Sequence, residues 1–145
     1  MDKRIKEHLK YLNRFTLHLL DARQLTRDEF LGDEIRQASV ERFLQLAIES
    51  CLNIGNRLLS LRQFKKPVKP PESYGDIFRQ LHRLGVTDSE LTDKLVRMAK
   101  FRNRLVHIYW EIDRDDLYRI LQEDIDDFKE FQKAVVNYLN DVEKT

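Results

Sequence analysis

Glycine and proline are scarce in this chain, and their scarcity constrains the fold more than any other feature. The 145 residues include four glycines and three prolines, whereas the two together usually make up about 12% of a chain. All three prolines, Pro67, Pro70 and Pro71, lie in one stretch. Sheets joined by many turns need more of both residues. The sequence therefore predicts an all-α fold whose one clear loop is Lys65–Pro71.

Outside that loop, apolar residues recur at steps of three and four, which is the spacing of one helix face. A short turn is predicted between the first two long segments, opened by a capping box of Thr26 with Glu29 and ended by Gly32. The connections are short, which favours an antiparallel four-helix bundle with one or two short extra helices, forming one domain over residues 1–145. The predicted helices are Asp2–Arg23, Asp33–Gln63, Tyr74–Leu84, Asp88–Val106 and Arg114–Val142.

Three local signals refine these helices. Gly55 lies inside a helix, where it costs about 1 kcal/mol relative to alanine, so we expect a close crossing with another helix there. Ser73 and Asp113 are the predicted caps of the helices that follow them. Thr87 with Glu90 predicts a capping box for Asp88–Val106.

Composition excludes several classes of protein. Apolar residues make up 41% and charged residues 35%, the mean hydropathy is −0.59, and no apolar run approaches the roughly 18 residues that a membrane span requires. Apolar content is too high for a typical disordered chain. The lone Cys51 excludes a disulfide framework and a multi-cysteine zinc site, and we interpret it as a small buried apolar residue. The first residues form no apolar signal region, so we expect a cytoplasmic protein.

The net charge of +1 conceals a segregation of charge along the chain. Residues 57–69 and 94–110 contain five basic residues each and no acid, whereas residues 111–130 contain nine acids and three bases. One interpretation is that these are ordinary solvated helix faces. The other is a basic surface for phosphates, with an acidic face free for other contacts.

The second basic stretch contains an unusual constellation over residues 102–109, in which Arg102 is followed by His107 and Tyr109. On a helix, Arg102 and Tyr109 share a face, and so do Asn103 and His107. Arg102 and His107 are about 140° apart on an ideal helix, so they would not converge. If the helix loosens near His107, the segment from His107 to Tyr109 becomes extended.

These residue types suit metal-independent RNA cleavage, which needs a base, an acid and a cation for the developing phosphorane charge. Histidine titrates near neutrality and can serve as base or acid, and arginine grips phosphate oxygens. One copy of the chain supplies too few groups. Two copies across a twofold axis would supply two histidines and two arginines, which predicts a homodimer with a shared cleft.

The segment resembles the Arg-x4-His-x-Tyr signature of the HEPN superfamily, specifically the HepT toxin family. The resemblance implies an α-helical homodimeric endoribonuclease with a composite site formed by Arg102, His107 and their dimer mates. It covers most of Val40–Asp113, and the loop at 64–71 has no counterpart in it. The similar blocks are residues 41–45, 47–51, 74–78, 85, 98–107 and 112–113.

The resemblance also implies a type VII-like toxin–antitoxin system, with tRNA or mRNA among the candidate substrates. Its partner would be a minimal nucleotidyltransferase antitoxin, which transfers AMP to Tyr109. A bulky phosphate-bearing group at the cleft would exclude RNA sterically and electrostatically. Two alternatives remain: a non-catalytic helical HEPN module that docks a nucleotidyltransferase, and a purely structural helical dimer.

Supporting roles follow for a few neighbours. Asn103 could hydrogen-bond His107 or the phosphate, and Arg97, Lys100 and Arg104 are candidates for contact with the RNA backbone, the alternative being ordinary solvated side chains. We expect no cofactor and no metal, because the chain has no Gly-rich phosphate loop and its histidines lack metal-ligand spacing. Side chains that contact phosphates do not read sequence, so the sequence does not predict which RNA is cut.

Overall fold

The computed structural model describes residues 1–62, 73–107 and 112–143. Within these residues every regular element is a helix, which confirms the all-α prediction. The predicted loop Lys65–Pro71 lies outside the described residues. The helices are α1 Lys3–Ala22, α2 Arg27–Leu31, α3 Glu34–Arg62, α4 Tyr74–Arg83, α5 Ser89–Val106, α6 Arg114–Glu123 and α7 Asp126–Glu143.

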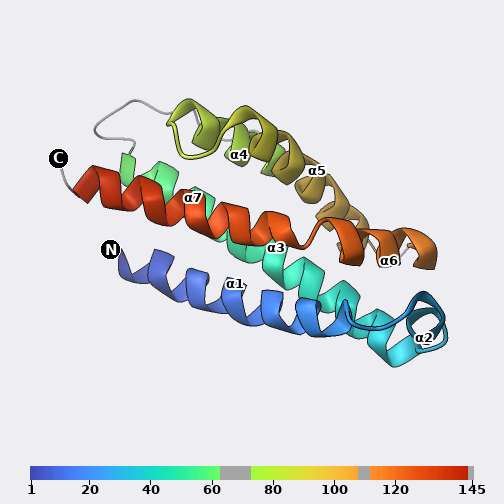
Figure 1. Ribbon diagram of the computed structural model, residues 1–145. Coiled ribbons are helices and arrows are strands. Elements are labelled where there is room, and N and C mark those ends of the chain that lie inside the picture. Colours follow the sequence, from blue (N-terminus) through green and yellow to red (C-terminus); the bar gives the residue numbers. More distant parts are fainter. Residues whose placement is uncertain (63–72, 108–111, 144–145) are drawn as a thin grey trace.

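The four long helices α1, α3, α5 and α7 run alternately in opposite directions, as an antiparallel bundle requires (Figure 1). Helix α3 is central and packs against each of the other six helices. This explains why its apolar residues cover several of its sides rather than one stripe. The N-terminus and the end of α7 lie at the same end of the bundle, where the amino group of Met1 is 3.1 Å from Oε1 of Glu143.

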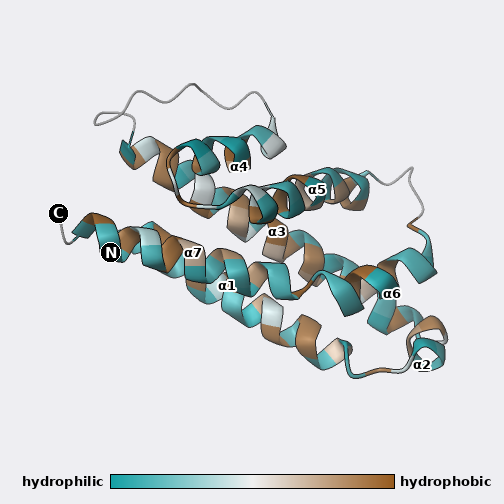
Figure 2. Cartoon of the chain, turned by 45° about the horizontal axis from the view of Figure 1, so that its top comes forward, coloured by the Kyte–Doolittle hydropathy of each residue, from teal (hydrophilic) through white to brown (hydrophobic). Residues whose placement is uncertain are grey.

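Hydrophobic and hydrophilic residues alternate around each helix (Figure 2), and most of the hydrophobic ones are buried between the helices. Phe30, Phe78, Phe128 and Phe131 are fully buried at the centre of the core. Gly55 marks the predicted close crossing, because a Cβ atom added there would lie 2.6 Å from Cγ2 of Ile77. Helix α4 therefore approaches α3 more closely than a larger residue would allow.

The helix starts follow the predicted capping signals with one exception. Thr26 and Glu29 form the predicted capping box, Ser73 caps α4, and Gly85 ends that region with a φ of 86°. The capping box at Thr87 and Glu90 is wrong. Asp88 caps α5 instead, its carboxylate accepting from the backbone N–H of Leu91 at 2.7 Å.

The hydroxyl of Thr87 is engaged elsewhere, which is the reason for that error. It lies 2.8 Å from the hydroxyl of Thr92 in a buried pair. Two residues able to cap stood next to each other in the sequence, and the packing of one of them into the core decided between them.

The prediction of one continuous helix over Arg114–Val142 is also wrong. The chain breaks between α6 and α7, where the backbone N–H of Asp127 donates to the carbonyl of Asp124 at 3.1 Å. Ile125, in the break, is fully buried. No glycine or proline marks this point, so the sequence carries no ordinary signal for it. The described chain consequently has three short helices, α2, α4 and α6, rather than one or two.

Candidate functional site

Helix α5 carries the predicted site residues from Arg97 to Arg104 and ends just before His107. Its last helical residue is Val106, and His107 follows with φ −87° and ψ 109°, an extended conformation. The loosening of the helix near His107 is thus confirmed at this residue, and the side chain of His107 is exposed. Tyr109 and its neighbours at 108–111 lie outside the described residues.

Arg102 is held on the side of α5 that faces α3 and α4. Its Nη2 donates to Oε1 of Glu49 on α3 at 3.0 Å. Its guanidinium carbon lies 4.8 Å from the centre of the Tyr74 ring at the start of α4. The side chain of Arg102 is only 19% exposed. A charged group this buried needs such partners, because removing it from water is costly.

No sequence pattern predicted Glu49 or Tyr74 as site residues. Both lie within blocks that resemble the HepT family, but they are far from Arg102 in the chain and no spacing rule links them to it. Only the packing of α3, α4 and α5 brings the three side chains together.

The structure does not bring Arg102 and His107 together within one copy. No hydrogen bond or ion pair among the described residues links His107 to Arg102 or to Asn103. Asn103 is exposed on α5. The end of the helix at Val106 removes the shared helical face that the spacing of Asn103 and His107 predicts.

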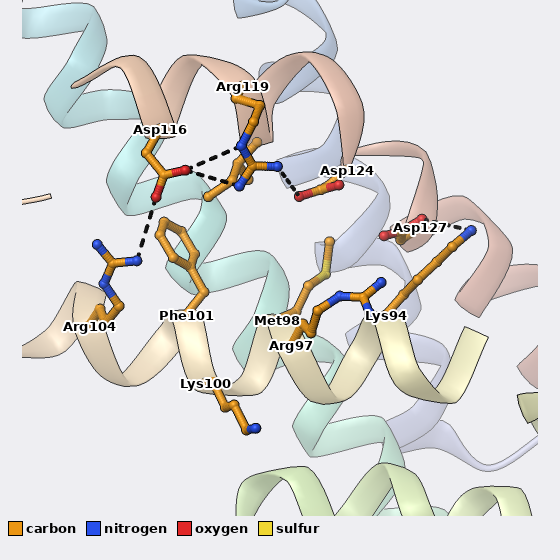
Figure 3. Close-up of a pocket in the computed structure, with 11 residues that line it drawn as sticks. Lys94, Arg97, Met98, Lys100, Phe101, Arg104, Asp116, Arg119, Asp124 and Asp127 are labelled. Atoms are coloured by element: carbon orange, nitrogen blue, oxygen red, sulfur yellow. Dashed lines mark hydrogen bonds and ion pairs between the residues drawn. The ribbon is translucent and has the colours of Figure 1, made fainter. Parts of the chain in front are cut away.

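The opposite side of α5 lines a groove of about 360 Å³ against α6 and α7 (Figure 3). Arg104 lies 3.6 Å from a carboxylate oxygen of Asp116, and Lys94 lies 3.7 Å from one of Asp127. Lys100, by contrast, extends away from the acidic side chains in Figure 3. The groove therefore mixes basic residues of α5 with acidic residues of α6 and α7.

This pairing corrects the prediction that the acidic segment forms a separate, free face. Acids from residues 111–130 sit directly opposite bases from residues 94–110. The first basic stretch is also partly neutralised, since Arg57 pairs with Asp2 at 2.9 Å. Arg62 is engaged without loss of charge, because it donates to the neutral hydroxyl of Tyr138 at 2.9 Å. Segments of opposite charge have therefore folded onto one another, including the two that follow each other in the sequence.

Burial perturbs two carboxyls in the groove. It raises the pKa of Asp127 to about 6, although the nearby Lys94 opposes that shift. Burial likewise raises the pKa of Asp124, against the effect of Arg119. Protonation of such carboxyls removes a desolvation cost, so the groove responds to mild acid.

A family model now decides the class of the protein. The model described as "HepT-like: Ribonuclease HepT-like" matches residues 5–135, most of the chain. The chain belongs to the ribonuclease HepT-like family. The resemblance drawn from the residues around Arg102 is confirmed, and with it the assignment of the chain as a ribonuclease.

Individual relatives of the HepT-like family agree. The tRNA nuclease HepT of Aphanizomenon flos-aquae is 25% identical over 97% of this chain and 92% of that protein. The mRNA nuclease HepT of Shewanella oneidensis is 31% identical over 71% of this chain and 74% of that protein. A solved structure, the tri-AMPylated Shewanella oneidensis HEPN toxin in complex with MNT antitoxin, is 26% identical. It has a TM-score of 0.84 and covers 94% of this chain and 99% of that one.

Other candidate chemistries of this HepT-like chain are limited. Cys51 is buried, and burial raises its pKa, which disfavours the reactive thiolate. Among the described residues, no cluster of three histidine, cysteine or acidic side chains could hold a metal ion. None of the helices in the described ranges has both the length and the apolar character needed to cross a bilayer.

Proposed function

We propose that this chain is the toxin of a type VII-like toxin–antitoxin system and a metal-independent endoribonuclease with Arg102 and His107 as its catalytic residues. The observation that carries the proposal is the end of α5. There, Arg102 is fixed by contacts to two other helices and His107 is exposed in extended backbone immediately after the helix. A fixed cation and a free imidazole are the two kinds of group that the chemistry requires.

The reaction is an attack by the ribose 2′-oxygen on the adjacent phosphorus. One His107 removes the 2′-hydroxyl proton and the other protonates the leaving 5′-oxygen, so that the products are a 2′,3′-cyclic phosphate and a free 5′-hydroxyl. Arg102 stabilises the negative charge of the phosphorane. Asn103 would support this centre by a hydrogen bond to His107 or to the phosphate.

Two copies of the chain are needed for this mechanism. Within one copy no hydrogen bond or ion pair among the described residues joins Arg102 to His107. In addition, a single histidine cannot act as base and acid in the same step. A homodimer with a shared cleft supplies the second histidine and arginine. The exposed position of His107 is compatible with a site that is completed by a second copy.

Basic residues on α5 would bind the RNA backbone around the cleft. Lys100, which points away from the carboxylates, is available without rearrangement. Arg97 and Arg104 face the acids of the groove, so phosphate would have to compete with carboxylates for them. Such contacts set affinity and register but not sequence preference.

The relatives supply the substrate class and the partner for this proposal. One is named a tRNA nuclease and another an mRNA nuclease, and a solved relative is AMPylated and complexed with MNT antitoxin. By analogy, a cognate nucleotidyltransferase antitoxin would transfer AMP to Tyr109, two residues after His107. The added phosphate charge and bulk would then close the cleft to RNA.

Cleavage of defined RNAs by the purified protein in EDTA tests the catalytic part. The wild type should cut tRNA or mRNA, and His107→Ala should lose the activity while it keeps its helicity and its dimer mass. Full activity of His107→Ala would contradict the assignment. Wild-type protein that cuts no RNA but still binds the antitoxin would favour the non-catalytic docking module.

Intact mass tests the regulatory part. Co-expression with the antitoxin should add mass in AMP units, and Tyr109→Phe should remove that addition. An unchanged addition in Tyr109→Phe would place the modification at another residue.

A further inference from the structure

Arg102 is the meeting point of three helices. Oε1 of Glu49 accepts from Nη2 of Arg102 at 3.0 Å, and the same oxygen accepts from Nε2 of Gln45 at 3.1 Å. The guanidinium carbon lies over the ring of Tyr74, 4.8 Å from its centre. A guanidinium on a long, flexible side chain is thus held from α3 on one edge and from α4 on its face.

Burial makes these contacts restrictive. The side chain of Arg102 is 19% exposed and that of Glu49 is 30% exposed. The Nε of Arg102 is buried without a hydrogen-bond partner among the described residues. Most surface arginine ion pairs are far more exposed and contribute little. Here the guanidinium is largely removed from water and held in one orientation. The buried Nε of Arg102, unpaired within the described part of the chain, adds a desolvation cost to this arrangement.

Fixed orientation matters for a group that stabilises developing charge. Preorganised charges act without reorganising during the reaction, and misplacement by about 1 Å can cost on the order of 100-fold in rate. Under the proposed function, other basic side chains of α5 bind the RNA backbone, so substrate binding does not depend on the orientation of Arg102. Loss of orientation at Arg102 should therefore reduce kcat more than it raises KM.

We propose that Glu49 and Tyr74 are positioning residues for Arg102, a role that rests on the proposed function of Arg102 in catalysis. Glu49, itself fixed by Gln45, sets the direction of the guanidinium through its charge and hydrogen bond. Tyr74 sets its plane through the ring face. Neither residue transfers a proton. The pH–rate profile therefore keeps its shape when either is replaced.

Four variants separate these contributions in a steady-state RNA cleavage assay. Glu49→Gln keeps a hydrogen-bond acceptor without the charge, and we expect kcat to fall about 10-fold or more. Glu49→Asp should restore part of that loss. Tyr74→Leu removes the ring and should lower kcat several-fold, whereas Tyr74→Phe keeps the ring and should match the wild type.

Glu34→Gln is the matched control, because it also removes a carboxylate of α3 that pairs with an arginine. Glu34 lies 3.7 Å from Arg114, and its side chain is 86% exposed. This control should leave kcat unchanged. Circular dichroism and thermal unfolding of every variant separate loss of positioning from loss of folding, and activity is compared only among variants that unfold at temperatures close to that of the wild type.

The results also separate failure of this inference from failure of the proposed function. If Arg102→Ala retains full activity, the function assigned to Arg102 is wrong. If Arg102→Ala is inactive while folded Glu49→Gln and Tyr74→Leu keep the wild-type kcat, only the positioning role is wrong. A pH–rate profile that loses one limb in Glu49→Gln would show that Glu49 itself transfers a proton and would also overturn it. Support requires a lowered kcat, an unchanged profile shape and no further loss when Glu49→Gln is added to Arg102→Ala.

Discussion

The two sides of α5 place the same residue type in different surroundings. Arg102 is mostly buried, with one carboxylate at 3.0 Å and one aromatic ring. Arg104, two residues later, is 45% exposed in a wide groove and lies 3.6 Å from Asp116. Both arginines lie over an aromatic ring, but the guanidinium carbon of Arg104 is 5.7 Å from the centre of the Phe101 ring, so Arg104 is held more loosely than Arg102 as well as being more exposed. A basic stretch is therefore not one functional unit, because the surroundings of each arginine depend on the helix that it faces.

The largest expected effect compares the two arginines directly. Arg102→Ala should lower kcat/KM for RNA cleavage by about 100-fold or more, since it removes charge stabilisation from the transition state. Arg104→Ala should lower it by less than about 10-fold, because Arg104 would contribute only a backbone contact. Both are measured by cleavage of one defined RNA under identical conditions. Equal losses in the two variants would abolish the distinction between the two sides.

The second-largest expected effect concerns the close crossing of α3 and α4, the two helices whose side chains contact Arg102. Gly55→Val would drive a side chain into Ile77, which lies 2.6 Å from even an added Cβ, so we expect a loss of about 1–3 kcal/mol in unfolding free energy. Chemical denaturation measures this loss. Gly75→Ala on α4 is the control, since its added Cβ would approach nothing closer than 3.4 Å. Wild-type stability of Gly55→Val would show that α4 can move away from α3 at little cost.

A smaller effect concerns Asp127 in the groove. Burial raises its pKa from the ordinary 3.8 to about 6, so the native state binds more protons than the unfolded state between these values. Below pH 3.8 the carboxyl is protonated in both states and its burial does not lower the free energy of unfolding. As the pH rises through 6 the buried carboxyl ionises in the folded state, and the free energy of unfolding falls. Asp127→Asn should therefore be more stable than the wild type by about 1–2 kcal/mol near neutral pH. The difference should disappear toward acid pH.

Denaturation of Asp127→Asn and the wild type across that pH range is the measurement. Asp126→Asn serves as control, because Asp126 is 63% exposed on the same helix and should change stability by less than about 1 kcal/mol at any pH. A stability difference that does not vary with pH would mean that Asp127 is not the titrating group.

The smallest effect tests whether the groove competes with RNA. Asp116 pairs with Arg104 at 3.6 Å and with Arg119 at 3.0 Å, and all three side chains are substantially exposed. Asp116→Asn should cost less than about 1 kcal/mol of stability, and it should tighten RNA binding a few-fold by freeing Arg104. Filter binding at several salt concentrations measures this, and the gain should shrink as salt rises. Unchanged affinity at low salt would remove Arg104 from the RNA-binding surface.

Much of the fold could be predicted from local patterns. The capping box of Thr26 with Glu29 and the turn at Gly85 form between residues that are close in the sequence. A pattern of a few residues is therefore enough to predict them. The break at Ile125 could not be predicted in this way. The break allows the side chain of Ile125 to be buried in a core formed by several helices. No residue beside Ile125 is of a type that predicts a turn.

The candidate site also has some features that local sequence predicts and others that depend on helix packing. Helix periodicity, caps and motif spacing are local properties, so the amino-acid sequence alone is enough to predict the helical fold, the family signature at Arg102 and His107, and the end of α5 near His107. The contacts of Glu49 and Tyr74 with Arg102, and of Asp116 with Arg104, depend instead on how α3, α4, α5 and α6 pack. Each contact joins residues of different helices, so no pattern within one helix predicts it.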